Sequence, residues 1–514
     1  MKFFKISLLV LVAFASTLSN SHAQSSNQIP AFVIDSLDSY IEREMKRWQV
    51  PDLAIAIVNG QNTIVSKGYG VKDIKTGEKV DENTLFQIAS NSKAFTGTAL
   101  AWLHHEKKID LDEKVIKYMP WFKLFLPEYT QLVTVRDLLC HRIGTQTFQG
   151  DFLNWGSNLS RKEIIEGLAK TPPVHPFRYK FGYNNAAFVT AGEIIPIITD
   201  TTWDDFIKHR IFIPLGMERT FTDFSKMKND KNACVPHTIY KGQLVGMDLV
   251  NIDNMAASAS ISSCVADMEK WLKLQLGKGT FNNKSIIPSS VISETWKSNT
   301  IITDYYGTFY PKNLTTYALG WQIYDYNGHR VIEHGGGANG FVTKTKIIPS
   351  LNLGIIVYTN SDTNSLYDLL ANQIIEAYMN LTYRNISQKV FEMSENSRKS
   401  ELQNIQSFED TIKQKNIPSF NLDLLIGKYR NDFYGFVEIK KVKNKYLVYF
   451  EHHPRNIATL EYLKDNRFVC YHSDITCGIE PASVEIVNDK LISITLKVND
   501  FIDYLSYKFD KINP

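Results

Sequence analysis

A serine and a lysine three residues apart carry the first chemical signal in this 514-residue sequence. Ser90 lies in the segment 86–103 (FQIASNSKAFTGTALAWL), where apolar residues recur at spacings of three and four. This spacing predicts an amphipathic helix that begins at Ser90 and carries Lys93 one turn further on the same face. A serine hydroxyl beside a buried, deprotonated lysine amine is an activated nucleophile. The free amides at the helix N-terminus favour the negative charge that develops there.

The same spacing also has a purely structural interpretation. In that interpretation Ser90 caps the helix and Lys93 is solvated. The pattern S-x-x-K is weak alone, since it recurs at residues 225–228 within a polar loop. The pair therefore needs support from other parts of the chain.

A second candidate lies on a turn that Gly182 introduces before the apolar segment 186–195. Tyr183 and Asn185 are two residues apart there, so both can point into one cleft. The pattern Y-x-N also begins at Tyr378, and the alternative is a packed turn tyrosine. By itself this motif does not establish a site.

The third candidate is an H-G-G-G sequence that follows a predicted strand at 331–333 and precedes another at 341–348. Glycines here would let a substrate backbone approach an exposed strand edge. The alternative is a flexible hairpin with an isolated histidine. H-G-G-G is also the oxyanion segment of α/β-hydrolases, but that family needs a G-x-S-x-G pentapeptide, which this chain lacks. The four residues are His334, Gly335, Gly336 and Gly337.

In this order, the three motifs resemble those of the serine β-lactamase and penicillin-binding-protein superfamily. The resemblance is to its class C-like branch, which includes D-aminopeptidases, DD-peptidases and esterases. It covers residues 30–382, and four further stretches support it: 134–144 (TVRDLLCHRIG), 212–217 (FIPLGM), 256–276 and 317–322 (YALGWQ).

The resemblance implies an α+β fold, in which an antiparallel sheet is flanked by helices and accompanied by a helical subdomain. It implies catalysis by an acyl-enzyme on Ser90, with Lys93 and Tyr183 sharing the proton as base and acid. Which of those two is the base stays open. Neither a metal nor an organic cofactor is implied. The residues implied in substrate binding or the oxyanion site are Asn185, His334, Gly335, Gly336 and Gly337.

Two departures from the family pattern are present. His334 stands where class C β-lactamases usually have lysine. Histidine is common at this position in the peptidases and esterases of the branch. Histidine is a weaker, pH-dependent anchor for a substrate carboxylate. Cys140 and Arg142 stand where the branch commonly has two threonines, and we draw no function from them.

Composition and the N-terminal segment limit which classes of function and which compartments are expected. The 57 basic and 54 acidic side chains nearly cancel, which gives no electrostatic case for nucleic acid or an anionic membrane surface. Lys2 and Lys5 precede an apolar run at 6–18, and Ser21 and Ala23 fit a signal-peptidase cut before residue 24. We therefore expect a cleaved signal peptide, a periplasmic or secreted protein and no membrane anchor after its removal.

The five cysteines form no disulfide framework, although Cys470 and Cys477 can pair across a turn. No cysteine pair or histidine pair has metal-ligand spacing, so we predict no zinc site.

The chain divides into four predicted parts: a signal peptide (1–23), a β-lactamase-related hydrolase domain (24–384), a polar helical linker (385–418) and a small all-β domain (419–514). Strands at both ends of the hydrolase domain predict one sheet with a helical insertion. Short β-rich runs with turns at 443–445 and 488–489 predict a final antiparallel barrel or sandwich. These predicted strands are 436–440, 446–450, 467–472, 483–487, 491–498 and 504–509. This last domain resembles the lipocalin-like domain of some family members.

The expected function is hydrolysis of small amides or esters, such as D-amino-acid peptides and cell-wall fragments or carboxylic esters. The alternatives are a true β-lactamase and a non-catalytic, penicillin-binding-like sensor of ligands. The sequence leaves the oligomeric state open.

Overall fold

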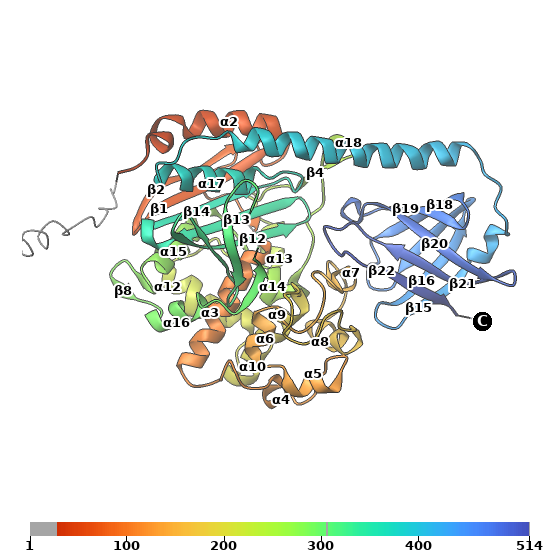
Figure 1. Cartoon of the computed structure of the whole chain (residues 1–514), viewed down its shortest axis with the longest axis horizontal. Helices are drawn as coiled ribbons and strands as arrows, with labels where there is room; N and C mark the ends of the chain where they lie inside the picture. Colours follow the sequence, from red (N-terminus) through yellow and green to blue (C-terminus); the bar gives the residue numbers. More distant parts are fainter. Residues whose placement is uncertain (1–27, 305–306, 513–514) are drawn as a thin grey trace, which may run out of the picture.

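The computed structural model describes residues 28–304 and 307–512, so the signal-peptide prediction lies outside the described residues. An eight-stranded antiparallel sheet runs in the order β2-β1-β14-β13-β12-β11-β10-β9 (Figure 1). Strands from before and after a helical insertion therefore share one sheet, as the sequence predicted. The strands are β1 (Asp52–Asn59), β2 (Asn62–Gly70), β9 (Thr300–Thr303), β10 (Lys312–Tyr317), β11 (Gln322–Tyr326), β12 (His329–Ala338), β13 (Phe341–Ile348) and β14 (Leu353–Thr359).

The sheet separates two hydrophobic cores, and β1 contributes to both. Successive strand side chains point to opposite faces, which explains why all but the last residue of β1 is buried. Leu53, Ile55 and Ile57 pack with α2 (Leu37–Trp48) and α17 (Leu366–Tyr378). The alternate residues Ala54, Ala56 and Val58 face the core of α3 (Ser92–His105) and α15 (Val265–Leu276).

Short helices fill most of the insertion between β2 and β9, and they surround α3. Gly97 on α3 allows close packing, because a Cβ atom there would lie 2.1 Å from the carbonyl oxygen of Leu319. A Cβ atom on Gly192 would lie 2.2 Å from the side chain of Ala257. The helices of the insertion, besides α3 and α15, are α4 (Val115–Tyr118), α5 (Pro127–Leu132), α6 (Val135–Leu139), α7 (Asp151–Asn154), α8 (Arg161–Gly167), α9 (Asn185–Gly192), α10 (Ile194–Thr199), α11 (Trp203–Ile207), α12 (Ile213–Leu215), α13 (Phe224–Lys228), α14 (Ala256–Ala259) and α16 (Ser289–Thr295). Three small ribbons pair β3 (Phe86–Gln87) with β6 (Ser262–Ser263), β4 (His237–Tyr240) with β5 (Gln243–Gly246), and β7 (Thr280–Phe281) with β8 (Lys284–Ser285).

The C-terminal region is a closed antiparallel barrel of eight strands. Two-residue turns with positive φ, at Lys443–Asn444 and Asn488–Asp489, join neighbouring strands, as type I′ hairpins require. Buried aromatic side chains, including Tyr429 and Phe509, fill its interior. The strands are β15 (Gly427–Asn431), β16 (Gly435–Val442), β17 (Lys445–Phe450), β18 (Ile457–Lys464), β19 (Arg467–His472), β20 (Ile479–Val487), β21 (Lys490–Lys497) and β22 (Ser506–Lys511).

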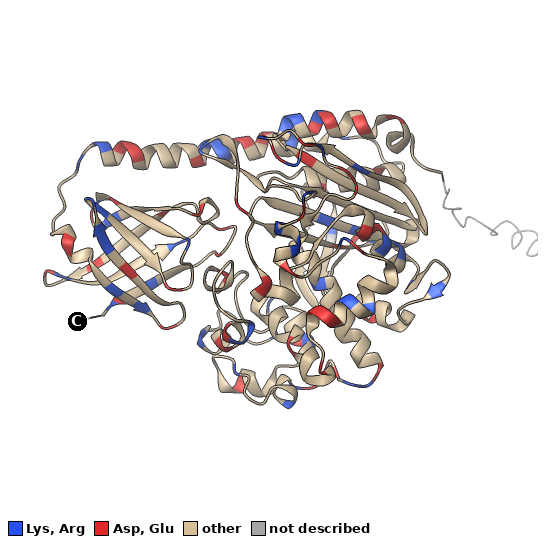
Figure 2. Ribbon diagram, turned by 180° about the vertical axis from the view of Figure 1, so that it is seen from behind, with Lys and Arg blue, Asp and Glu red and all other residues tan. Residues whose placement is uncertain are grey.

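Helix α18 (Ile386–Lys413) runs from the sheet to the barrel (Figure 1). Its first turn is anchored by the Ser387 hydroxyl, which accepts from Trp48 Nε1 at 3.1 Å and donates to Glu44 at 2.6 Å. Further on, Glu409 pairs with Lys241 at 2.9 Å. Figure 2 shows basic and acidic residues interspersed along this helix, as expected for its solvated faces.

The structure differs from the sequence-based expectations at several elements. H-G-G-G lies inside β12, not after its end, because residues 334–338 continue to pair with β13. Strands β15 and β18 were not expected. Cys470 and Cys477 are unpaired and buried, like the other three cysteines. Within the described residues, no group of three His, Cys, Asp or Glu residues could hold a metal ion. The same part of the chain has no helix that is apolar and long enough to span a bilayer.

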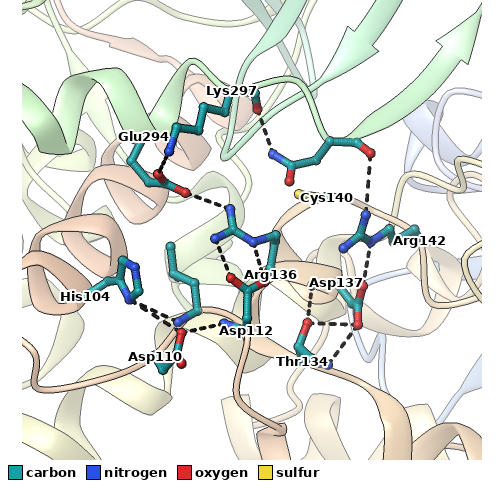
Figure 3. A network of polar contacts seen from close by, with 12 residues as sticks. His104, Asp110, Asp112, Thr134, Arg136, Asp137, Cys140, Arg142, Glu294 and Lys297 are labelled. Atoms are coloured by element: carbon teal, nitrogen blue, oxygen red, sulfur yellow. Dashed lines mark hydrogen bonds and ion pairs between the residues drawn. The ribbon is translucent and has the colours of Figure 1, made fainter.

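A buried carboxylate organises helix α6 and the turn that follows it (Figure 3). The Asp137 side chain accepts from the backbone amide of Thr134 at 2.9 Å in a capping box. It also pairs with Arg142 at 2.5 Å and with Arg178 at 2.6 Å. Burial raises the pKa of Asp137, but the bonds from Arg178 and Thr134 and the charge of Arg142 outweigh burial and hold it below its usual value. Arg142, one of the departures noted above, therefore has a structural role.

Replacement of Asp137 by alanine should lower the free energy of unfolding by about 1–3 kcal/mol, because the helix cap and the bonds to two partly exposed arginines are lost. Urea unfolding at pH 7 measures this. Since the folded pKa is depressed, the stabilisation is present above the unfolded pKa of about 3.9 and is lost as pH falls through the folded value. The exposed Asp432→Ala should change stability by less than about 0.5 kcal/mol. A comparably small effect of Asp137→Ala would contradict this role.

Candidate active site

Ser90 lies on a one-turn 3-10 helix, η2 (Ala89–Asn91), between β3 and α3. The preceding residue, Ala89, is fully buried and has φ of 46°, a left-handed conformation that costs free energy in a residue with a Cβ atom. Strand β12 approaches this turn closely, since a Cβ atom on Gly336 would lie 2.1 Å from the carbonyl oxygen of Ile88. Ser90 is thus held on a sharp turn against the glycines of β12.

The Lys93 amine is fully buried behind Ser90. Its Nζ atom lies 3.0 Å from Ser90 Oγ. Two further oxygens surround it, Asn185 Oδ1 at 2.6 Å and the Ser258 carbonyl at 3.0 Å. Burial lowers the pKa of Lys93 well below its ordinary value, although the Asp151 carboxyl opposes the shift. The environment therefore favours a neutral amine.

Tyr183 lies beside both Ser90 and Lys93. Its phenol is hydrogen-bonded to the Ser90 side chain, and its ring centre lies 4.6 Å from Lys93 Nζ. Burial raises the pKa of Tyr183 far above its ordinary value; the bond to Ser90 opposes this shift and the charge of Asp151 adds to it. The phenol therefore keeps its proton at neutral pH.

His141 lies behind Tyr183, and sequence reasoning did not select it. The two rings are 4.2 Å apart. Nδ1 of His141 accepts from the backbone amide of Asn184 at 3.0 Å, so Nε2 carries the proton. Burial is the largest cause that lowers the pKa of His141 well below its ordinary value. The stretch TVRDLLCHRIG contained this residue, but its packing against Tyr183 required the fold.

His334 is buried as a neutral ring. Its Nε2 atom lies 2.8 Å from the Tyr317 hydroxyl, and its Nδ1 atom lies 2.6 Å from the carbonyl oxygen of Gly335. Burial, followed by the charge of Lys93, lowers the pKa of His334 to about 3. The sequence indicated a weak, pH-dependent anchor for a carboxylate at this position, and the low pKa disfavours the cationic form of such an anchor at neutral pH.

Gly335, Gly336 and Gly337 pair with β13 along one edge of β12. The pairing of β12 with β11 ends at Glu333, so the other edge of the glycines faces η2 and Ser90. The barrel also reaches this point: a Cβ atom on Gly337 would lie 3.3 Å from the ring of Phe501. Phe501 belongs to the loop at 498–505 between β21 and β22.

The same barrel loop reaches Tyr183 through aromatic side chains. The ring of Tyr504 lies 5.4 Å from that of Phe148, which lies 5.6 Å from that of Tyr183. Beside these contacts, a cavity of about 970 Å³ lies between the helical insertion and the barrel. Its lining includes Trp155, Asn339 and Ile502. Residues of the barrel therefore form one side of the candidate active site.

The structure thus brings Ser90, Lys93, Tyr183 and Asn185 together, with His334 and the glycines of β12 beside them. Sequence reasoning missed His141, Phe501 and also Asp151, whose carboxyl accepts from Asn185 Nδ2 at 2.6 Å. No sequence motif marked Asp151 or Phe501, because both act across long separations in the chain.

Comparisons with known proteins concern the family and the fold of the chain. A family model described as Beta-lactamase matches residues 37–379. Unguisins hydrolase ungD' of Aspergillus campestris is 26% identical over 419 residues, which cover 77% of this chain and 74% of that protein. Protein flp of Staphylococcus aureus strain MRSA252 is 26% identical over 355 residues, 66% of each chain. The octameric penicillin-binding protein homologue from Pyrococcus abyssi superposes with a TM-score of 0.60 and 20% identity, covering 93% of this chain and all of that chain. This last likeness concerns the fold alone.

The depressed pKa of His334 predicts a measurable loss of stability in acid. Between its unfolded pKa, about 6.5, and its folded pKa, about 3, only the unfolded state binds the proton. Stability should therefore fall as pH falls through this window, by about 1 kcal/mol per pH unit for this histidine. Urea unfolding between pH 4 and 6 should show a shallower pH dependence in His334→Gln than in the wild type. The exposed His209→Gln serves as control, and equal slopes for all three proteins would contradict a neutral His334.

Proposed function

Since the chain belongs to the beta-lactamase family, we propose that it is a serine hydrolase that works through an acyl-enzyme on Ser90. The proposed substrates are small amides and esters, such as D-amino-acid-containing peptides or carboxylic esters. The name of the similar Aspergillus protein, a hydrolase, supports the reaction class. The predicted signal sequence supports action outside the cytoplasm, and export remains part of the proposal.

The observation that carries the proposal is the set of oxygens around Lys93 Nζ. The Asn185 and Ser258 oxygens can only accept hydrogen bonds, so they take the two N–H groups of a neutral amine. The lone pair of the amine then faces Ser90 Oγ at 3.0 Å, where it can accept the hydroxyl proton. This geometry supports Lys93 as the base for Ser90.

Tyr183 has the complementary role in the proposal. Its phenol keeps its proton and lies beside the Ser90 side chain, so it is placed to give that proton to a leaving group. When Ser90 attacks a carbonyl carbon, its proton passes to Lys93 and the carbonyl oxygen becomes an oxyanion. The backbone amides of Ser90 and Gly337 are the proposed donors to that oxyanion. Collapse of the intermediate expels the leaving group, which takes a proton from Tyr183.

Protonated Lys93 then returns the proton to Tyr183, and the acyl group stays on Ser90. A water molecule attacks the acyl-enzyme and gives a proton to the same lysine–tyrosine pair. The bond between Ser90 Oγ and the acyl carbon then breaks, the pair returns the proton to Ser90 Oγ, and the acid is released. Asn185 keeps Lys93 in place through both halves of the reaction. The scheme uses side chains of this chain and water throughout.

The neutral His334 supports neutral substrates over carboxylate-bearing ones. An ion pair with a substrate carboxylate needs a cation, and the pKa of His334, about 3, disfavours one. β-Lactams carry such a carboxylate, so β-lactam hydrolysis is the second candidate. The exposed aromatic Phe501 beside Gly337 offers a surface for an apolar substrate group.

Hydrolysis of a p-nitrophenyl short-chain ester by the protein without residues 1–23 tests the reaction class. The wild type should release nitrophenol and form an acyl adduct on Ser90 that intact-mass measurement detects. In Ser90→Ala, turnover should fall by at least about 10³-fold, because the nucleophile is absent. Equal rates in both proteins would reject the proposal and favour a ligand-binding protein. D-Amino-acid amides and a penicillin, assayed alongside, separate the two candidate substrates.

Tyr183→Phe should slow amide hydrolysis far more than nitrophenyl-ester hydrolysis. An amine leaving group needs a proton from Tyr183, whereas nitrophenolate leaves as an anion. We expect a loss of about 10²- to 10⁴-fold in kcat on a D-amino-acid amide and a loss of less than about 10-fold on the ester. Equal losses on both substrates would show that Tyr183 does not protonate the leaving group.

A further inference from the structure

We propose that Asp151 is a positioning residue for the Lys93 amine, and that the C-terminal barrel holds Asp151 in place through Asp503. Asp151 comes from the helical insertion and Asp503 from the loop between β21 and β22. The inference rests on the proposed function, since it assigns a way of holding the base of that reaction.

The first step is the orientation of the Asn185 amide. Its Oδ1 atom accepts from Lys93 Nζ at 2.6 Å, and its Nδ2 atom donates to Asp151 Oδ2 at 2.6 Å. A flipped amide would place N–H groups against the lysine N–H and an oxygen against the carboxyl oxygen. Asp151 therefore fixes the amide with its acceptor toward Lys93.

The second step is the burial of this chain of contacts. Lys93, Asn185 and Asp151 are all at most 5% exposed. Water is therefore a poor substitute for a missing partner, and an unpaired amide group here would be costly. The three side chains should move as one unit.

The third step is the set of hydrogen bonds that joins the barrel to the backbone around Asp151. Asp503 Oδ2 accepts from the amides of Gly150 at 3.0 Å and Phe152 at 3.3 Å. The same oxygen accepts from the Tyr507 hydroxyl at 2.6 Å, and that hydroxyl accepts from Gly150 at 3.1 Å. The backbone amides of the two residues on either side of Asp151 are thus bound to one barrel carboxyl.

Aromatic side chains add to the contacts between this segment and the barrel. The ring of Phe152, next to Asp151, lies 4.8 Å from that of Tyr434 and 5.8 Å from that of Tyr507. On the other side, a Cβ atom on Gly150 would lie 2.8 Å from the ring of Phe433. The segment 150–152 is therefore seated against the barrel, and its geometry depends on the barrel being in place.

The test compares Asp151→Ala, Asp151→Asn and Asp503→Ala in the full protein, with Asp500→Ala as control on the same loop. Asp500 is 64% exposed and pairs only with Lys497 among the described ion pairs. For the p-nitrophenyl ester, kcat should fall about 100-fold in Asp151→Ala and about 10-fold in Asp503→Ala, with KM within about threefold. Asp151→Asn should recover most of kcat, since its amide oxygen can still accept from Asn185. Asp500→Ala should behave as the wild type.

Unchanged kcat in Asp151→Ala, or an equal loss in Asp151→Asn, would overturn the inference. Thermal unfolding of each variant separates loss of folding from loss of positioning. If Asp151→Ala does not fold, Asp503→Ala decides, and unchanged kcat there rejects the role of the barrel.

The failure of the proposed function would look different. In that case the wild type and Ser90→Ala would hydrolyse the ester equally. Crystal structures of Asp151→Ala and Asp503→Ala would then decide the inference without turnover. Displacement of the Asn185 amide or of Lys93 supports it, and contacts unchanged from the wild type overturn it.

Discussion

The removal of the Lys93 amine from water is the constraint on which the rest of the site depends. A buried ammonium ion costs several kcal/mol unless it is paired, so the amine favours its neutral, basic form. Burial requires close packing around the first turn of α3. Gly320 allows this, because a Cβ atom there would lie 2.3 Å from the Lys93 carbonyl oxygen. Glycines at 97 and 192 bring the neighbouring segments equally close. The burial of Lys93 therefore accounts both for the close packing around the first turn of α3 and for the neutral, basic form of the amine.

Local patterns in the sequence predicted the parts of the site that lie close together in the chain. Ser90 and Lys93 are three residues apart where η2 passes into α3, and Tyr183 lies two residues before Asn185, the first residue of α9, so spacing alone relates each pair. The fold class followed from the order of the motifs and from strands on both sides of a helical region. The neutral state of His334 did not follow, because burial and the nearby Lys93 set it.

Other features required the three-dimensional arrangement. Asp151 reaches the site through Asn185, and Asp503 reaches it across 353 residues of sequence from Gly150. Strand β12 continues through three glycines because β13 pairs with it, which overrides the low strand propensity of glycine. Strand β15 (GKYRN) is short and mostly polar, with Tyr429 as its one buried residue, so its pattern gave no signal. Such contacts depend on packing between distant segments, which periodicity does not report.

The link between Asp503 and the segment around Asp151 also bears on the order in which the molecule is made. During synthesis the serine, the lysine and the tyrosine emerge from the ribosome hundreds of residues before the barrel loop that binds the segment around Asp151. The hydrolase domain can begin to collapse while that loop is still untranslated, since domains generally fold as units from the N-terminal side. Contacts of such long sequence separation form late. A growing chain would thus carry an incompletely organised active site until its last strands have been added.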